Sequence, residues 1–382
     1  MKIILEKISD YFKYTDKFLW LLVVALNTFS LLIIASMQRA GDYNFLRTQT
    51  IAVAIGAVGA VVLSVIDYKF IHRFWWLAAL AGLGLIGIVF IFGTRVEGTD
   101  DTAWINIGSY SLQPSEIVKI CFIVTLSVHL SWLVKNDLIR SFPQICLLGV
   151  HGVIPILLIH IQGDDGSALI FALIFMIMTF AAGMQIRYYM AAFLTVSLAA
   201  PFVWTKVLND DQRNRFLVLL NLDGNAKSVY GWQQYQAKLS ISAGGYTGEG
   251  LFHGQRVGYA IVPEQENDFI ITVAGEELGF IGCCIILILF VALLFRIFYK
   301  SARARDEFGQ NLCIGVFALL LSQVSINLGM VLGFLPVVGV TLPFFSAGGT
   351  SVLGIMLCIG IVQSVHLYSD DTRLIIAPHS DD

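Results

Sequence analysis

The stretch that decides the fold runs from residue 269 to residue 298 and reads FIITVAGEELGFIGCCIILILFVALLFRIF. A helix needs about 20 predominantly apolar residues to cross the hydrocarbon core of a membrane. This run exceeds that length, and its only charged residues are Glu276, Glu277 and Arg296. Lipid offers no water to bond with free backbone groups, so a run of this kind must be helical. The stretch therefore predicts a membrane-spanning helix.

The rest of the chain has the same character. It has 382 residues, of which 57% are hydrophobic and only 13% are charged, against about 25% charged residues in an ordinary soluble domain. This balance excludes a soluble globular protein, and it excludes disorder, which requires low hydrophobicity and high charge. A net charge of −3 without a basic stripe gives no sign of nucleic-acid binding. We therefore predict an all-α, polytopic membrane helix bundle that forms a single domain over residues 1–382.

Ten apolar runs are long enough to span a membrane. They cover residues 18–37, 48–66, 74–92, 114–134, 143–160, 166–184, 188–206, 269–298, 310–335 and 344–366. A membrane β-barrel would instead show alternating segments of about ten residues. The six cysteines all fall within these runs, where they behave as small apolar residues, so we predict neither disulfides nor a metal cage.

The distribution of Lys and Arg predicts the orientation of the spans. Cytoplasmic loops are enriched in these residues, and the short outer loops hold only Arg39, Arg47 and Arg95 when the N-terminus is placed inside. Four lysines precede the first span and no small-residue cleavage site follows it, so we expect no cleaved signal peptide. We predict a multi-pass protein of the cytoplasmic membrane with both termini in the cytoplasm.

Three outer segments carry the polar chemistry. They are residues 93–113, the acidic turn QGDDGS at 162–167, and the long loop 207–267. Structureless loops of such length are uncommon and are usually functional. Within the long loop, residues 213–223 and 231–242 are predicted to lie in the headgroup layer, the second as an amphipathic helix. The glycine-rich run that follows lacks the GK[ST] of a nucleotide-binding loop.

Asp268 comes directly before the eighth span, and two interpretations of it stand side by side. Asp is favoured at a helix N-cap, where it offsets the helix dipole. Alternatively, Asp268 is a carboxylate at the outer membrane surface that acts as a general base. Glu276 would lie about 80° around the helix from Asp268 and about 12 Å deeper, with Glu277 on the opposite side. Glu276 could thus share a cavity with Asp268, unless both glutamates pair with bases or amides on neighbouring helices.

The fourth span opens with QPSEIVK, residues 113–119. Proline suits the first helical turn because that turn needs no N–H. Glu116 and Lys119 are three residues apart, so they share a face of the helix and can form an ion pair. Lys119 either extends its amine to the membrane surface or directs a cation at an anionic headgroup.

Five stretches together resemble the SEDS family of peptidoglycan glycosyltransferases, which includes RodA, FtsW and SpoVE. They are WINIGSYSLQPSEIVK (104–119), QGDDGSAL (162–169), GWQQYQAKLSISAGGYTGEG (231–250), VPEQENDFIITVAGEELGFIG (262–282) and LPFFSAGGTSVLG (342–354). They are spread over most of the chain and follow the order found in the family. LPVVGVTLP (335–343) and GIVQSVH (360–366) are more similar to RodA or a sporulation relative than to FtsW.

The resemblance implies polymerisation of lipid II into glycan strands on the outer face of a bacterial cytoplasmic membrane. It implies that Asp268 is the catalytic residue. Substrate-binding roles are expected for Glu116, Lys119, Asp164, Gln236, Lys238, Glu264 and Glu276, and for the loop arginines Arg213 and Arg215. A divalent cation, Mg²⁺ or Mn²⁺, is a candidate cofactor, and no organic cofactor is expected. The expected partners are a class B penicillin-binding protein and other elongation or division proteins.

The chain departs from the family at several motif positions. Ala103 replaces an arginine often found before the motif tryptophan, Ser111 replaces a common basic residue, and Ala260 replaces a frequent glutamate. We expect Arg95, Arg213 or Arg215 to be candidates for binding the substrate's pyrophosphate instead. A division or sporulation polymerase, a lipid II flippase and a non-enzymatic scaffold are the alternatives to a RodA-like polymerase.

Overall fold

The computed structural model describes residues 11, 13–38, 44–95, 102–108, 110–219 and 229–369. In this part of the chain, nine helices are long and apolar enough to cross a membrane. They are α2 (Lys17–Met37), α3 (Phe45–Val65), α5 (Trp75–Phe92), α6 (Pro114–Lys135), α7 (Phe142–Ile161), α9 (Ile186–Phe202) with its extension η2 (Val203–Val207), α13 (Ile270–Ala302), α14 (Glu307–Val331) and α15 (Gly349–Ser369). The predicted all-α, multi-pass membrane architecture is confirmed.

The remaining predicted span is α8 (Asp165–Ala181), which has only 17 residues. Other boundaries differ from the prediction where the backbone turns. The predicted run 310–335 ends at Val331, because Gly333 adopts a positive φ of 76°. The run 344–366 becomes helical only at Gly349, because residues 344–348 form an irregular turn in which Phe344 has φ 66°. Length and apolar character located the spans, whereas local turn geometry decided where they end.

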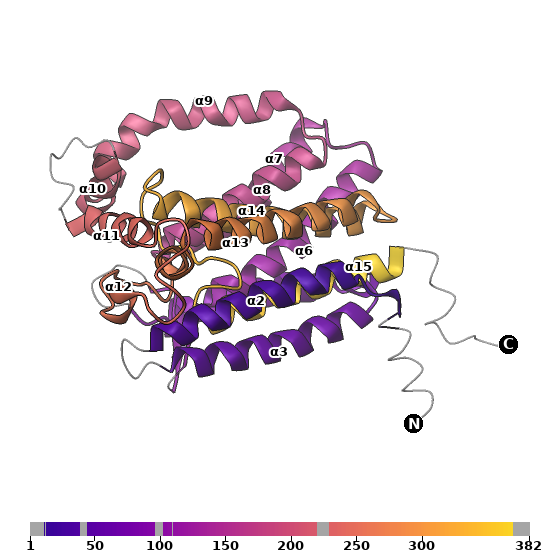
Figure 1. Ribbon diagram of the computed structural model, residues 1–382. Coiled ribbons are helices and arrows are strands. Elements are labelled where there is room, and N and C mark those ends of the chain that lie inside the picture. Colours follow the sequence, from indigo (N-terminus) through magenta and orange to yellow (C-terminus); the bar gives the residue numbers. More distant parts are fainter. Residues whose placement is uncertain are drawn as a thin grey trace.

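The short elements lie between the spans. They are α4 (Tyr68–Arg73), α10 (Asp210–Leu219), α11 (Val229–Ala243), α12 (Gln255–Gly258), and the strands β1 (Ile105–Ile107) and β2 (Tyr110–Leu112). The two strands form an antiparallel hairpin that the sequence analysis did not predict; Ile105 pairs with Leu112, and Asn106 with Ser111. Figure 1 shows α10, α11 and α12 together at one end of the bundle, opposite the end where α2 begins and α15 ends.

The predicted amphipathic helix at 231–242 is confirmed as part of α11. Its apolar side chains Trp232, Tyr235 and Leu239 are exposed, whereas Gln234 and Gln236 are buried. The Gln234 amide donates to the carbonyl oxygens of Met330 and Leu335, at 2.8 Å each, and this anchors α11 to the end of α14. An apolar exposed face suits contact with lipid. Of the other predicted segment, residues 213–219 belong to α10 and residues 220–223 lie outside the described residues.

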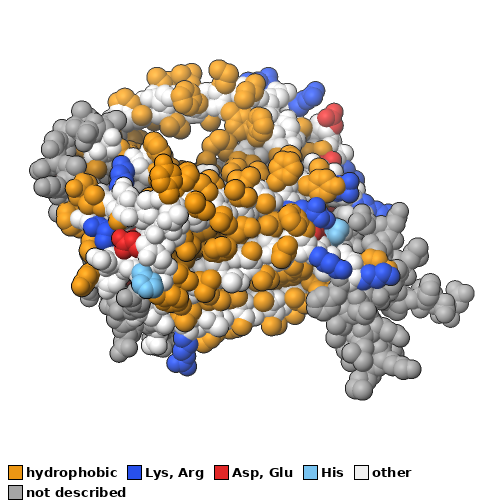
Figure 2. All heavy atoms as spheres, in the orientation of Figure 1, with side chains coloured by type: hydrophobic (Ala, Val, Ile, Leu, Met, Phe, Trp, Pro, Cys, Tyr) orange, Lys and Arg blue, Asp and Glu red, His pale blue; other side chains and the backbone are white. Residues whose placement is uncertain are grey.

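Burial is uneven across the bundle. The helices α14 and α15 are the most enclosed, whereas α9 has no buried residue and runs apart from the other long helices (Figure 1). Hydrophobic side chains cover the visible sides of the helices, and the Lys and Arg side chains in view gather near the two ends of the bundle (Figure 2). This distribution matches a bundle whose middle is embedded in lipid.

The helix α13 is broken at Gly279, where the sequence analysis expected a continuous helix. Gly279 has φ 66° and ψ −166°, which a residue without a Cβ adopts without strain. The freed backbone groups pair with residues 245–250: the amide of Phe280 donates to the Gly245 carbonyl at 2.9 Å, and the amide of Gly250 to the Glu277 carbonyl at 3.0 Å. Residues 245–250 thus supply backbone partners for the groups that the break leaves free, as a membrane environment requires.

An ion cluster joins three spans at the end of the bundle remote from α10–α12. Asp16, which is 3% exposed, caps α2 and bonds to Arg296 at 2.7 Å and to Lys300 at 2.8 Å. Its backbone exchanges hydrogen bonds with the Gln363 side chain at 3.0 and 3.2 Å. Burial of Asp16 favours its neutral form, but Arg296 and Lys300 outweigh that effect and lower the pKa of Asp16 to about 2.

We predict that Asp16→Asn lowers the free energy of unfolding by about 2 to 4 kcal/mol, because it leaves two cations without their carboxylate. Since the pKa of Asp16 is depressed from 3.8 to about 2, its contribution is present above about pH 4 and is lost as the pH falls toward 2. Thermal unfolding in detergent micelles measures the effect. Asp210→Asn removes the exposed partner of Arg213 and serves as the control, with little expected change. Equal melting temperatures for the two variants would contradict the structural role of Asp16.

Candidate active site

Asp268 lies at the end of an irregular loop that leads into α13. The N-cap of α13 is Phe269, not Asp268, so the N-cap interpretation of Asp268 was wrong. The loop folds tightly: the amides of Asn267 and Phe269 both donate to the Glu264 carbonyl at 3.1 Å, and the Asn267 side chain donates to the Glu264 carboxylate at 2.8 Å. Glu264 has a positive φ of 57°, a conformation that persists only where the surroundings hold it.

Asp164 forms a second wall of the site. One of its carboxylate oxygens accepts from the Ser167 amide at 2.8 Å and so caps α8. The other accepts from the Gln113 side chain at 2.9 Å and from the Ser115 hydroxyl at 3.1 Å. Asp164 is 6% exposed. The predicted acidic turn therefore ties the first turn of α8 to the start of α6.

The segment 337–340, between α14 and α15, brings Asp268 and the Asp164 turn together. A Cβ placed on Gly339, which has φ 67°, would lie 3.7 Å from Asp268 Oδ2. A Cβ on Gly166, the second residue of α8, would collide with the Val338 carbonyl at 2.2 Å. Both glycines permit an approach that a side chain would block. Three loops far apart in the sequence thus meet around the Asp268 carboxylate.

The charges around Asp268 suit a general base. Burial raises the pKa of the Asp268 carboxyl to about 7, with further contributions from the negative charges of Glu264 and Asp164. No side chain or backbone group in the described part of the chain donates a hydrogen bond to this carboxylate. A carboxylate with a pKa near neutrality and free lone pairs is suited to take a proton from a substrate hydroxyl at physiological pH.

The two candidate arginines of α10 point to different places. Arg215 donates to the Val337 carbonyl at 3.2 Å, so it reaches the segment that borders Asp268. Arg213 instead bonds to Asp210 at 3.2 Å and to the Thr205 carbonyl at 3.3 Å. The Gln212 side chain donates to Asp165 at 2.7 Å. The helix α10 therefore contacts the acidic turn through Gln212. Of its two arginines, Arg215 is the one that bonds to the segment bordering Asp268.

The predicted ion pair of Glu116 and Lys119 is present at 2.9 Å. The two residues are only 5% and 1% exposed, so the first of the two alternatives, in which Lys119 extends its amine to the membrane surface, was wrong. The pair packs toward α15, because a Cβ on Gly354 would lie 3.3 Å from the Glu116 carbonyl. In this arrangement the Lys119 amine is turned into the bundle.

Glu276 is completely buried, and its hydrogen bonds run to backbone amides of α12 and not to groups that border Asp268. Its carboxylate accepts from the amides of Arg256 at 2.6 Å and Val257 at 3.3 Å, so the alternative of amide pairing describes it. Glu277 pairs with the Ser36 hydroxyl and with the Gly254 amide at 3.4 Å. The loop that repairs the break in α13 covers both glutamates.

Gln236 and Lys238 lie on α11 rather than beside Asp268. Gln236 is buried and its side-chain oxygen accepts from the Arg256 guanidinium at 2.5 Å. The Lys238 side chain is exposed and lies over Gly333 at the end of α14. Their predicted roles in substrate binding would place substrate along α11.

Sequence reasoning missed two residues that hold the Asp268 loop, Asn327 and Ser346. Asn327 is completely buried and donates to the Asp268 carbonyl at 2.7 Å and to the Val340 carbonyl at 2.8 Å. The Ser346 hydroxyl donates to the Asn267 carbonyl at 2.7 Å. An asparagine inside an apolar span was the signal available, because polar residues in membrane helices are rare and tend to be functional.

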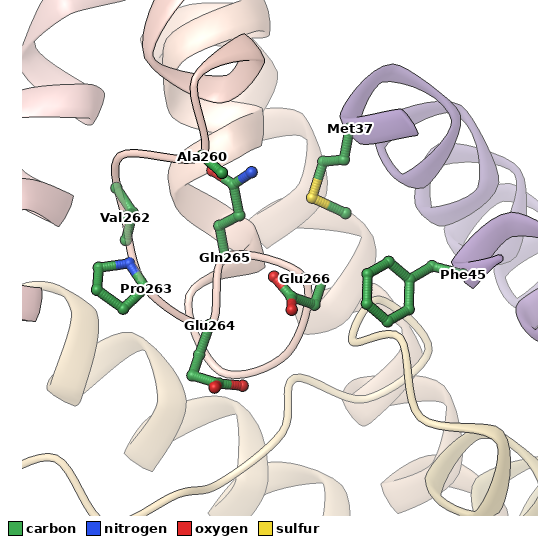
Figure 3. A pocket seen from close by; sticks show the side chains of 8 residues that line it. All are labelled: Met37, Phe45, Ala260, Val262, Pro263, Glu264, Gln265 and Glu266. Carbon is green, nitrogen blue, oxygen red and sulfur yellow. The ribbon is translucent and has the colours of Figure 1, made fainter. Parts of the chain in front are cut away.

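A cavity of about 180 Å³ lies between the loop 260–266, the last residue of α2 and the first residue of α3. It is lined by Met37, Phe45, Ala260, Val262, Pro263, Glu264, Gln265 and Glu266. Figure 3 shows the Glu266 carboxylate beside Phe45. Burial and the nearby Glu264 raise the pKa of Glu266. Glu264 thus borders this cavity and also acts on the charge of Asp268.

The described residues bring together no group of three or more His, Cys, Asp or Glu side chains that could hold a metal ion. Mg²⁺ is nevertheless often held by one or two carboxylates together with substrate phosphates. The described residues therefore suit a divalent cation that arrives as a companion of a substrate diphosphate.

Known proteins resemble the chain over nearly its whole length. A probable peptidoglycan glycosyltransferase FtsW from Trichlorobacter lovleyi is 34% identical over 366 residues, covering 92% of each chain. The peptidoglycan glycosyltransferase MrdB of Escherichia coli K12 is 31% identical over 360 residues, covering 93% of this chain and 94% of its own. A solved chain from a peptidoglycan synthase complex that coordinates polymerization and crosslinking matches with a TM-score of 0.80 and 25% identity, covering 94% of this chain and 99% of its own.

The family model for cell cycle proteins of the FtsW, RodA and SpoVE type matches residues 14–371. Relatives carrying different names within that family match at similar identity, so the prediction of a RodA-like branch stays a prediction. This match covers almost the whole chain and agrees with the helical bundle, so the chain belongs to the FtsW, RodA and SpoVE family of cell cycle proteins.

Proposed function

We propose that the protein is a peptidoglycan glycosyltransferase that polymerises lipid II into glycan strands at the outer face of a bacterial cytoplasmic membrane. The observation that carries the proposal is Asp268: its carboxylate has a pKa of about 7, receives no hydrogen bond from the described residues and lies where three loops meet. The similarity to two curated peptidoglycan glycosyltransferases supports the same activity.

The proposed reaction joins two lipid-linked sugars. The acceptor's 4-hydroxyl oxygen attacks the anomeric carbon of the donor, and the bond from that carbon to the diphosphate oxygen breaks. The diphosphate leaves with the bonding electron pair, and the configuration at the donor carbon inverts. Asp268 takes the proton of the attacking hydroxyl. A diphosphate is a good leaving group when cations neutralise it, so one carboxylate can suffice where an inverting glycosidase needs two.

The diphosphate requires positive charge close to Asp268. Arg215 is the best placed of the predicted cations, because its guanidinium bonds to the segment 337–340 that also borders the Asp268 carboxylate. Lys119 could contribute only after its buried pair with Glu116 opens. A Mg²⁺ or Mn²⁺ ion would supply further charge neutralisation when it arrives with the diphosphate. The exposed apolar face of α11 would let the prenyl tails stay in lipid while the sugars meet outside.

We propose a class B penicillin-binding protein as partner, together with other elongation or division proteins. The solved chain with a TM-score of 0.80 belongs to a synthase complex that couples polymerization to crosslinking. The orientation that follows from Lys and Arg places both termini in the cytoplasm and the Asp268 site outside.

Replacing Asp268 with Asn should abolish polymerisation without unfolding the protein, because the amide cannot accept the proton. General-base catalysis typically contributes roughly 10²- to 10⁴-fold in rate. Purified protein is incubated with lipid II, Mg²⁺ and the cognate transpeptidase, and the glycan ladder is resolved on a gel. Asp210→Asn, an exposed carboxylate on α10, is the matched control and should keep full activity. Glycan ladders of equal intensity from both variants would remove Asp268 from the mechanism.

The polymerisation rate should rise with pH around a midpoint of about 7, the pKa of Asp268, because the protonated carboxyl cannot act as a base. Glu264→Gln removes a negative charge that raises this pKa. The midpoint should therefore move to lower pH in the variant, and the ratio of its rate at pH 6 to its rate at pH 8 should increase. Initial rates measured from pH 5.5 to 8.5 test this. A midpoint that stays in place or moves upward would contradict the assignment.

A flippase and a scaffold are the rival functions, and the same preparation separates them. Wild-type protein that folds and binds its partner but makes no glycan would favour one of the two. Movement of fluorescent lipid II across liposomes would then identify the flippase.

A further inference from the structure

Hydrogen bonds to the backbone of the Asp268 loop fasten it to the C-terminal part of the chain. The carbonyl oxygens of Glu266, Asn267 and Asp268 are consecutive, and each accepts a hydrogen bond from the C-terminal part of the chain. The donors are the Ala347 amide at 2.8 Å, the Ser346 hydroxyl at 2.7 Å and the Asn327 side chain at 2.7 Å. Two of these three donors are side chains, and both are at most 1% exposed.

These contacts matter because no group in the described residues donates a hydrogen bond to the Asp268 carboxylate. A base must lie within hydrogen-bond reach of the proton that it takes, and a misplacement of about 1 Å can cost about 10²-fold in rate. No group in the described chain fixes the Asp268 side chain directly. Its position must therefore be set through the backbone at residues 266–268.

Asn327 links the Asp268 loop to the segment that faces it. Its single amide group donates both to the Asp268 carbonyl and to the Val340 carbonyl, at 2.7 and 2.8 Å. Val340 adjoins Gly339, whose backbone faces the Asp268 carboxylate. One buried side chain thus sets the distance between the catalytic loop and the segment opposite it.

Ser346 is positioned in turn by its own surroundings. Its hydroxyl accepts from the Leu342 amide at 2.7 Å. The carbonyls of the two preceding residues are held by α2 and α3: Gln49 donates to the Phe344 carbonyl at 3.0 Å, and Ser30 to the Phe345 carbonyl at 3.2 Å. Phe344 has a positive φ of 66°, and strain of this kind persists where neighbouring groups enforce it.

We propose that Asn327 and Ser346 are positioning residues of the glycosyl transfer, which hold Asp268 at the acceptor hydroxyl through the backbone carbonyls of residues 267 and 268. Neither touches the reacting atoms. This inference rests on the proposed transferase function and assigns that function two residues outside the stretch that contains the base.

The test is a steady-state comparison of Asn327→Ala and Ser346→Ala with wild-type protein in complex with its transpeptidase. Each variant should lower kcat about 10- to 100-fold and leave KM for lipid II within about twofold. Lipid II binding should be equal in Asp268→Asn and in Asp268→Asn/Asn327→Ala, because Asn327 does not contact substrate. A purely structural defect would instead lower the amount of active protein and leave kcat per folded molecule unchanged.

Asn311 supplies a matched control. It is a buried asparagine of the same helix, 3% exposed, and its side-chain nitrogen has no partner in the described residues. Asn311→Ala should therefore leave kcat unchanged. If Asn327→Ala does not fold, Ser346→Ala decides alone, because it removes the hydrogen bond to the neighbouring carbonyl of the same loop, that of Asn267.

The outcomes separate the two proposals. Wild-type protein without polymerase activity would overturn the transferase function and the positioning role with it. Wild-type activity with an unchanged kcat in the folded variants, or a rise in KM alone, would overturn the positioning role and leave the transferase function standing.

Discussion

The structure depends on one constraint: irregular backbone next to a membrane must find its hydrogen-bond partners inside the protein. The chain meets this demand with loops that bond to one another. Residues 245–250 fill the break in α13 at Gly279. The carbonyl oxygens of residues 266–268 accept hydrogen bonds from Ala347, Ser346 and Asn327. The same bonds that satisfy the backbone also bring distant loops to one place.

The chemistry of the site depends on how the two carboxylates Asp268 and Asp164 are surrounded. Burial of Asp268, together with the negative charges of Glu264 and Asp164, disfavours its charged form and raises its pKa to about 7. Asp164 differs because it accepts hydrogen bonds from three donors, the Gln113 side chain, the Ser115 hydroxyl and the Ser167 amide. Two carboxylates at one site are therefore suited to different tasks, a base and a structural cap, because their surroundings differ.

Much of the fold was predictable from the sequence, because lipid imposes length and apolar character on each span. The ten predicted runs correspond to ten helices, including the short α8, and the amphipathic segment at 231–242 lies within α11. Asp268 was identified as a candidate from its place before the eighth span and from the family motif. The break in α13, the β1–β2 hairpin and the burial of Lys119 were not predicted, because they depend on contacts between distant segments. Asn327 was missed for the same reason: its partners lie 59 and 13 residues away.

The central claim, that Asp268 drives glycosyl transfer from a lipid diphosphate donor, is tested most directly by following two products in one reaction. Lipid II is supplied to the wild-type protein and to Asp268→Asn, and both undecaprenyl diphosphate release and glycan length are recorded over time. We expect diphosphate release and glycan growth to rise together in the wild type, with one diphosphate for each new bond, and both to stop in the variant. Diphosphate release that continues unchanged in Asp268→Asn, or that occurs without glycan growth in the wild type, would contradict the account.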